Sequence, residues 1–335
     1  MLRVIDFGSV TPLRSQTLWH AVAYGVSAGA APTLSFARPS APYVCLGYHR
    51  DLDEVDQEYC RSHGLPVYRR MVGGGPVYLD EHQLFFQICL PAGDVSPARG
   101  QALAALLAPA VTAFRAVGVP ARLDDAGEIC AGDSKICGHG AGQIEDAVVV
   151  CGNLIEAFDH DRAARVLALT DPVQREETRL LMRRYVTATP ADPAAFTTAL
   201  TSAYAAALHR TPEPGELSAA ERAQVAELDE RFTSAGWLAG PRRSGGRGTA
   251  RPVKVRAGVW TLAAQAAGAR AVASVVSGRV ERIAISVPGQ VRAARDAEAA
   301  LAGLPVARAA DVLGRLGEPG RQLATALAGA EGRVP

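Results

Sequence analysis

Two arginines followed by three glycines form the clearest chemical motif in this sequence. Arg69 and Arg70 are separated by two residues from the glycines at 73–75. Consecutive glycines let a backbone approach a ligand closely, and their amides can surround an anion such as phosphate. Guanidinium groups match the geometry of phosphate oxygens. The spacing fits neither a Walker loop nor a Rossmann fingerprint, so the motif indicates either another kind of nucleotide loop or an ordinary bend.

Lysine is the second signal, because it is scarce. Of 35 basic residues only Lys135 and Lys254 are lysines, and arginine serves everywhere else. Lys135 follows a turn that begins at Gly132. A lysine there could simply protect a strand edge. An ammonium is also a compact donor, and near a glycine cradle it could bind both a carboxylate and a phosphate while an acid is adenylated.

The elements that must position these residues alternate between short strands and helices in the first half of the chain, which predicts a sheet flanked by helices. A mostly helical stretch follows, from Arg162 to about Thr233. The expected strands are Leu2–Asp6, Thr33–Ala37, Tyr43–Leu46, Pro66–Arg70, Val77–Leu90, Glu128–Ala131, Ile136–Gly142 and Val148–Ile155. The expected helices are Ser15–Ser27, Asp53–His63 and Ala98–Val117.

A chain of 335 residues exceeds the size at which single cores usually divide into two domains. The segment Pro241–Arg256 contains six basic residues, three glycines, two prolines and no acid, which is typical of a linker. Beyond it, a hairpin and a helix at Ala293–Ala302 predict a small α+β unit. We expect a large domain over residues 1–240, a basic linker over 241–256 and a small domain over 257–335.

Composition excludes several function classes. A net charge of +1 gives no reason to expect nucleic acid or a membrane surface as partner. The sequence has no long apolar run and no secretory signal, so we expect a soluble, cytoplasmic protein. The cysteines have no paired two-residue spacing typical of a metal or redox site, so buried free thiols are expected. They are Cys45, Cys60, Cys89, Cys130, Cys137 and Cys151.

In their order along the chain, these motifs resemble those of the lipoate-protein ligase family, relatives of biotin protein ligases and of lipoyl or octanoyl transferases. The run Arg69–Asp80 is similar to the family's nucleotide and lipoate loop, and Gly132–Gly142 to the turn that carries its characteristic lysine. The resemblance covers residues 1–240. It includes an acyl-pocket segment at Cys45–His49, a core strand at Cys151–Ile155 and the end of the catalytic domain at Phe232–Gly240.

The resemblance implies an α/β (α+β) fold, with a mixed sheet flanked by helices in a class II synthetase-like ligase catalytic domain. Through its hairpin Ala271–Val287, the small domain is similar to the family's accessory domain, which assists formation of the acyl adenylate. The implied reaction uses ATP and Mg²⁺ to activate lipoate as lipoyl-AMP. The acyl group then passes to a lysine of a lipoyl-carrier protein, and no protein nucleophile is needed.

Individual roles follow from the same resemblance. Lys135 would be the catalytic residue, contacting the acyl carboxyl and the α-phosphate. The nucleotide would contact Arg70, Gly75, Pro76, Val77, Tyr78 and Lys135. The groove for the acyl group and the adenylate would be lined by Gly47, Gly73, Gly74, Gly138 and Gly140.

Four positions depart from the family's usual residues. Pro76 replaces a small residue, Leu79 a histidine, and Val72 a serine or threonine, and Cys151 stands where a histidine is typical. These changes make the pocket more apolar and remove hydrogen-bonding groups. They leave the choice between lipoyl and octanoyl open.

Other functions stay open at this point. An octanoyl or lipoyl acyltransferase would work through a cysteine thioester, for which Cys151, Cys130 and Cys137 are available. A noncatalytic binder that keeps the fold is a second alternative. His49 and His139 could act as general bases or simply line a pocket. The basic segment from Arg242 could meet an acidic carrier or remain a solvated linker.

Overall fold

The computed structural model describes residues 1–95, 99–240 and 250–331. The chain divides into two compact units. The first comprises Met1–Ala168 and Thr187–Arg242, and the second comprises Leu169–Val186 and Arg243–Pro335. Within the described ranges, no helix has the length and hydropathy needed to cross a membrane.

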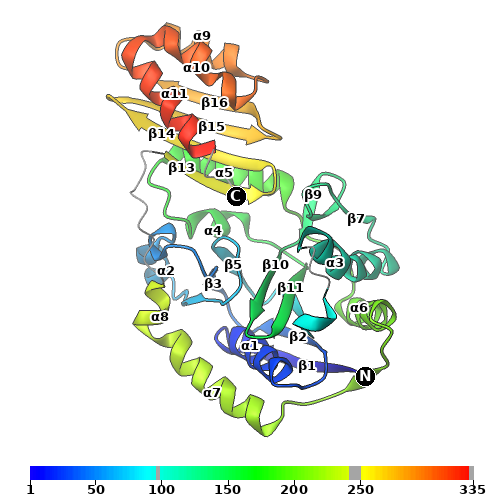
Figure 1. Ribbon diagram of the computed structural model, residues 1–335. Helices are drawn as coiled ribbons and strands as arrows, with labels where there is room; N and C mark the ends of the chain where they lie inside the picture. Colours follow the sequence, from blue (N-terminus) through cyan, green and yellow to red (C-terminus); the bar gives the residue numbers. More distant parts are fainter. Residues whose placement is uncertain (96–98, 241–249, 332–335) are drawn as a thin grey trace. The chain divides into compact units, whose positions relative to one another are not determined.

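A mixed sheet of six strands forms the centre of the first unit (Figure 1), in the order β10-β11-β6-β2-β1-β12. β1, β2 and β12 run parallel, while β6, β11 and β10 pair antiparallel. Eight of the nine β6 residues are buried, as expected for a strand covered on both faces. The strands are β1 Leu2–Val10, β2 Thr33–Pro39, β6 Gln83–Pro91, β10 His139–Ile144, β11 Ala147–Ile155 and β12 Pro212–Pro214.

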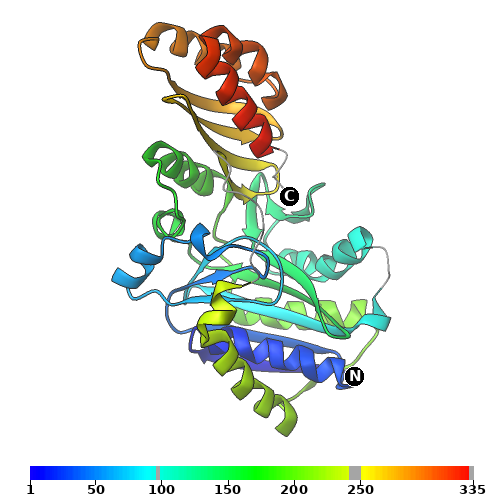
Figure 2. The same cartoon turned by 60° about the vertical axis from the view of Figure 1, so that its left-hand side comes forward.

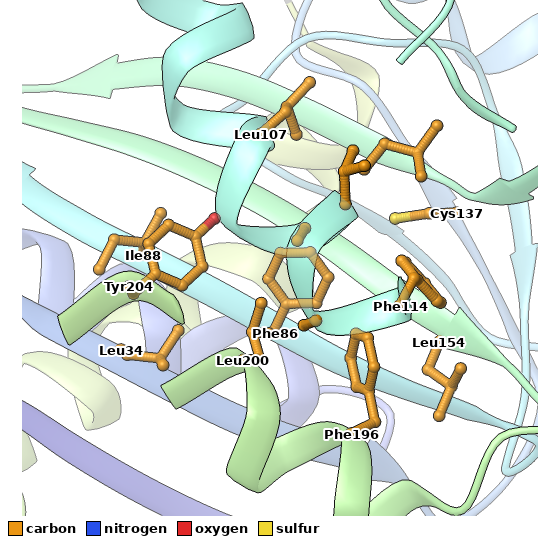
Figure 3. Close-up of a cluster of buried hydrophobic side chains, with 14 of the residues drawn as sticks. Leu34, Phe86, Ile88, Leu107, Phe114, Cys137, Leu154, Phe196, Leu200 and Tyr204 are labelled. Carbon is orange, nitrogen blue, oxygen red and sulfur yellow. The ribbon is translucent and has the colours of Figure 1, made fainter. Parts of the chain in front are cut away.

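Helices cover both faces of this sheet. One face packs against α3 (Arg99–Ala116) and α6 (Pro193–Ala207), and Figure 3 shows their apolar side chains meeting those of the strands, with Phe86 close to Phe196. The other face packs against α1 (Arg14–Ser27), on which α7 (Ala219–Thr233) lies. Because side chains alternate along a strand, β6 contributes to the core on both sides. The predicted mixed sheet flanked by helices is confirmed.

Two small sheets carry the motifs of interest. One has the order β4-β3-β5 and the other β7-β8-β9. The first unit is completed by the short helices η1 Leu52–Glu54, α2 Gln57–Ser62, η2 Ala92–Asp94, α4 His160–Arg165 and α8 Ala235–Ala239. The small-sheet strands are β3 Tyr43–Leu46, β4 Val67–Arg69, β5 Val77–Leu79, β7 Ala121–Leu123, β8 Ile129–Ala131 and β9 Ser134–Cys137.

Two expected strands are each divided in the structure. The run Val77–Leu90 becomes β5 and β6 in different sheets, because Asp80 accepts a hydrogen bond from the His82 amide and turns the chain. The run Ile136–Gly142 divides at Gly138, whose amide donates to the Asn153 side chain instead of to a strand partner.

The second unit contains an antiparallel sheet of four strands, in the order β13-β14-β15-β16. Figure 2 shows the C-terminal helices together on one face of it. The strands are β13 Ala250–Arg256, β14 Val259–Ala266, β15 Ala269–Val276 and β16 Arg279–Ser286. The helices are α9 Val291–Leu301, η3 Val306–Arg308, α10 Ala309–Leu313, η4 Gly314–Leu316 and α11 Gly317–Glu331.

Helix α5 (Pro172–Tyr185) covers the opposite face of this sheet, so the domain limits differ from those expected. Residues 169–186, assigned to the large domain, group with the small one. Of the expected linker 241–256, residues 241–249 lie outside the described residues, and Ala250–Arg256 form β13. That strand resembled a linker because it contains three basic residues, a proline and no acid.

Candidate active site

Arg70 shapes the glycine loop from inside. Its side chain is buried, and its guanidinium donates to the carbonyls of Cys45 at 3.0 Å, Gly73 at 2.8 Å and Gly75 at 3.0 Å. These bonds tie the loop to β3. The expected contact between Arg70 and ATP remains a prediction, and in this structure the guanidinium supports the loop backbone.

Arg69 organises a wider region and was not given this role from the sequence. Its guanidinium is fully buried and donates to six backbone carbonyls, while burial lowers the pKa of the group. Three of these carbonyls belong to the C-terminal half of α8, where helix carbonyls lack intrahelical partners. The acceptors are Gly47, Tyr48, Arg50, Trp237, Leu238 and Ala239.

Gly240 is the sequence signal that could have revealed this arrangement. It ends α8 with a positive φ of 70°, which favours glycine. A Cβ added there would lie 2.4 Å from the Arg69 Cζ. Two independent constraints therefore favour glycine at this position, the positive φ and the close contact with Arg69.

Four of the five glycines expected to line the groove, Gly47, Gly73, Gly74 and Gly140, lie close to one another, while the space beside Gly138 is taken by Asn153. A Cβ on Gly47 would lie 2.1 Å from the Gly74 carbonyl oxygen, so the two backbones touch where no side chain fits. A Cβ on Gly140 would lie 3.6 Å from the Gly73 oxygen and 3.5 Å from the Cys151 Sγ. Strand β10 thus lies against the glycine loop.

Lys135 lies on β9 beside a carboxylate that the sequence did not single out. Its Nζ is 2.6 Å from Glu128 Oε2, and the two side chains are 16% and 6% exposed. The same Glu128 oxygen is 3.8 Å from His139 Nδ1. Since β9 leads directly into β10, Lys135 is only three and five residues away in sequence from Gly138 and Gly140.

A polar network joins the Lys135 segment to the end of β5. The Gly138 amide donates to Asn153 Oδ1 at 2.6 Å, and Asn153 Nδ2 donates to Gln83 Oε1 at 2.9 Å. Gln83 Nε2 in turn donates to Asp80 Oδ1 at 3.2 Å, and burial raises the pKa of this Asp80 carboxyl. The network fixes the two loops relative to each other.

The other expected nucleotide contacts differ in exposure. Gly75 and Val77 are exposed, and Pro76 is half-buried. The Tyr78 ring is buried, its hydroxyl lies 3.5 Å from an Arg162 nitrogen, and burial raises its pKa to about 12. A nucleotide contact at Tyr78 would therefore involve its backbone.

None of the candidate cysteines has the surroundings of an activated thiol. Burial raises the pKa of Cys137 to about 12 and also raises that of Cys151. Cys151 is half-buried, with Sγ 3.4 Å from the Gly140 carbonyl, and the buried Cys130 lies 3.5 Å from Asp124 Oδ2. A thiolate is the reactive form, so these environments disfavour a thioester mechanism.

The two histidines do not share one setting. His139 lies beside Glu128, whereas the His49 ring packs against Tyr48, with ring centroids 4.8 Å apart. Among the described residues, no group of three or more His, Cys, Asp or Glu side chains could hold a metal ion.

Comparison with known sequences identifies relatives of two kinds. Lipoate–protein ligase 1 of Staphylococcus aureus is 29% identical over 127 residues, which is 38% of this chain and 38% of that protein. The octanoyltransferase LipM of Moorella thermoacetica is 24% identical over 274 residues, covering 70% of this chain and 97% of its own length.

Solved structures share the fold. A bipartite lipoate protein ligase of Thermoplasma acidophilum, described with its E2 lipoyl domain, aligns with a TM-score of 0.64 and 22% identity, over 72% of this chain and 98% of its own. A lipoate-protein ligase A bound with ATP aligns with a TM-score of 0.60 and 22% identity, over 71% of this chain and 98% of its own. Plasmodium falciparum LipL1 in complex with lipoate aligns with a TM-score of 0.57 and 13% identity, over 85% of this chain and 84% of its own.

The lipoyl protein ligase A/B catalytic domain model matches residues 13–188, which is more than half of the chain. This range contains the glycine loop, Lys135 and the groove glycines. The class II synthetase-like ligase fold with a C-terminal domain, expected from the motifs, is confirmed. The chain belongs to the lipoyl protein ligase A/B family.

Proposed function

We propose that the protein is an ATP-dependent lipoate–protein ligase. The carboxylate of lipoate attacks the α-phosphate of ATP, forming lipoyl-AMP and releasing pyrophosphate. A lysine of a lipoyl-carrier protein then attacks the mixed anhydride and releases AMP. Mg²⁺ enters with the nucleotide, since it is commonly bound through substrate phosphates.

One observation carries the proposal. In a chain with two lysines, Lys135 is held nearly buried on the strand that continues into the groove glycines. An ammonium in such a position can bind the acyl carboxylate and stabilise charge that develops on the α-phosphate. At Gly73 and Gly75 a Cβ would meet nothing within 4 Å, so the backbone there is open to the approach of an adenylate.

The remaining parts of the proposal concern the groove and the second unit. We also propose that the nucleotide contacts Arg70, Gly75, Pro76, Val77 and Tyr78. The second unit would assist formation of the adenylate. The basic stretch proposed as a carrier contact lies partly outside the described residues, and its last seven residues form β13.

The direct test is pyrophosphate release from the purified protein with ATP, Mg²⁺ and either lipoate or octanoate, without a carrier. We expect release that depends on the added acid, and the ratio of the two rates ranks the substrates. Pyrophosphate release that is absent with both acids, in a folded protein, would contradict the ligase proposal.

A carrier-to-carrier octanoyltransferase is the second candidate. It is favoured by the relative LipM, which this chain matches over 97% of that protein's length. It would require an acyl-cysteine, with Cys151 the most accessible of the three candidates. Incubation with an octanoylated carrier in the absence of ATP, followed by mass spectrometry, would detect the thioester. We expect none, because burial raises the pKa of this thiol.

A further inference from the structure

Glu128 is a buried carboxylate to which the proposed reaction gives no role. A tight turn presents it, in which Asp124 Oδ1 accepts hydrogen bonds from the amides of Ala126 at 3.0 Å and Glu128 at 2.9 Å. The Asp124 amide in turn donates to the Glu128 carbonyl at 2.9 Å. Three bonds therefore fix the backbone on which the carboxylate is mounted.

A β-bulge aims Lys135 at this carboxylate. In the β8–β9 ladder Ile129 pairs with Cys137, whereas Cys130 pairs with Lys135, so Ile136 is an extra residue on β9. Glu128 lies two residues before Cys130 and projects to the same side of the ladder. Cross-strand neighbours on one face can form an ion pair, and here Nζ and Oε2 are 2.6 Å apart.

The burial of this pair has a consequence for catalysis. An ammonium with little access to water is costly unless it is paired, so Glu128 stabilises Lys135 while the groove is empty. The acyl carboxylate and the α-phosphate present the same kind of oxygen to Lys135. Substrate binding can therefore exchange one carboxylate partner for another, and His139, 3.8 Å from the same oxygen, remains beside Glu128.

We propose that Glu128 is a positioning residue, which holds Lys135 in the ligand-free site and releases it to the acyl carboxylate and α-phosphate. This inference rests on the proposed ligase function. Glu128 acts only through Lys135 and does not itself contact the reacting atoms.

A double-mutant cycle tests this dependence. Glu128→Gln keeps the size of the side chain and removes the charge, and we expect kcat for pyrophosphate release to fall on the order of 10- to 100-fold. In the Lys135→Ala background the same change should have no further effect. Glu128→Asp, which restores the charge on a shorter side chain, should recover part of the rate. If Glu128→Gln lowered kcat by the same factor in the Lys135→Ala background as in the unsubstituted protein, the proposal would be overturned.

The matched control is Glu58→Gln, because Glu58 pairs with Arg61 in an exposed ion pair in the same unit. Exposed pairs of this kind contribute little. We expect kcat to stay within about twofold of the unsubstituted protein. A loss as large as that of Glu128→Gln would show that removing a glutamate charge has a general effect, contrary to the proposal.

Competitive acylation of the two lysines gives a readout that needs no activity. With a small amine-acylating reagent and mass spectrometry, the paired and mostly buried Lys135 should react more slowly than the exposed Lys254. Glu128→Gln should raise the ratio of Lys135 to Lys254 labelling at least threefold.

An unchanged labelling ratio would show that Glu128 does not hold Lys135. An unsubstituted protein that releases no pyrophosphate would contradict the ligase function, while the labelling ratio would still decide whether Glu128 holds Lys135. The two failures are therefore distinguishable.

Discussion

The glycine loop and strand β9 position their cations by different means. On the glycine-loop side, Arg69 and Arg70 donate to backbone carbonyls, six of them for Arg69 alone. On the β9 side, Lys135 faces the carboxylate of Glu128. The Arg69 guanidinium cannot turn toward a ligand without leaving carbonyls unsatisfied, whereas an ammonium can exchange one carboxylate for another. The comparison separates an arginine that builds the loop from the lysine that we propose acts on substrate.

Replacement of Arg69 should give the largest effect and would test the structural half of this comparison. Arg69→Met removes a donor from six carbonyls, of which only those of Gly47 and Trp237 also accept from the backbone amide of a described residue, so we expect the free energy of unfolding to fall by at least about 3 kcal/mol. Urea unfolding followed by circular dichroism measures it. Arg61→Met, at an exposed ion pair, should change it by no more than about 0.5 kcal/mol. Equal losses in the two variants would remove the special role of Arg69.

The close approach of the two loop backbones predicts an intermediate effect. Gly47→Ala places a Cβ 2.1 Å from the Gly74 oxygen, and since backbone must then shift, we expect a loss of about 1–3 kcal/mol in unfolding free energy. Gly75→Ala is the matched control, because a Cβ there meets nothing within 4 Å. Thermal unfolding of the pair measures the difference. If both variants unfold at the same temperature, the contact between the two backbones is not tight.

Substitution of the groove thiol should have the smallest effect. Cys151→Ser keeps the contact with the Gly140 carbonyl, and the ligase account needs no nucleophile there, so lipoate-dependent pyrophosphate release should stay within about twofold. Steady-state kinetics with and without the substitution decides this. A loss of more than about 100-fold in carrier acylation would instead support transfer through a thioester.

The fold was largely predictable because hydropathy periods report secondary structure directly. The expected helix Ser15–Ser27 corresponds to α1, and the strand Val148–Ile155 corresponds to most of β11. The membership of α5 was not predictable. An amphipathic face, here with Thr178, Leu181 and Tyr185 buried, looks the same in sequence whichever sheet it packs against.

The site was predictable where residue types are rare and unpredictable where tertiary pairing decides. Lys135 stood out because the chain has one other lysine, and the glycines at 73–75 because they are consecutive, whereas Gly47, Gly138 and Gly140 were indicated only by the family resemblance. Glu128 is one acid among 34 acidic residues, and only the bulged β8–β9 ladder identifies it as the partner of Lys135. The arginine pair suggested phosphate binding. The carbonyls of α8 that accept hydrogen bonds from Arg69 are far from it in sequence, so the residues around 69 and 70 do not indicate them.

The central claim is that Lys135 is the cation that acts on the acyl group and the nucleotide. Its most direct test compares Lys135→Ala with Lys254→Ala in acid-dependent pyrophosphate release, since these are the chain's two lysines and Lys254 lies in the other unit. We predict that Lys135→Ala lowers kcat by at least about 10²–10³-fold in a protein that remains folded, while Lys254→Ala retains full activity. Full activity of a folded Lys135→Ala protein would contradict the account.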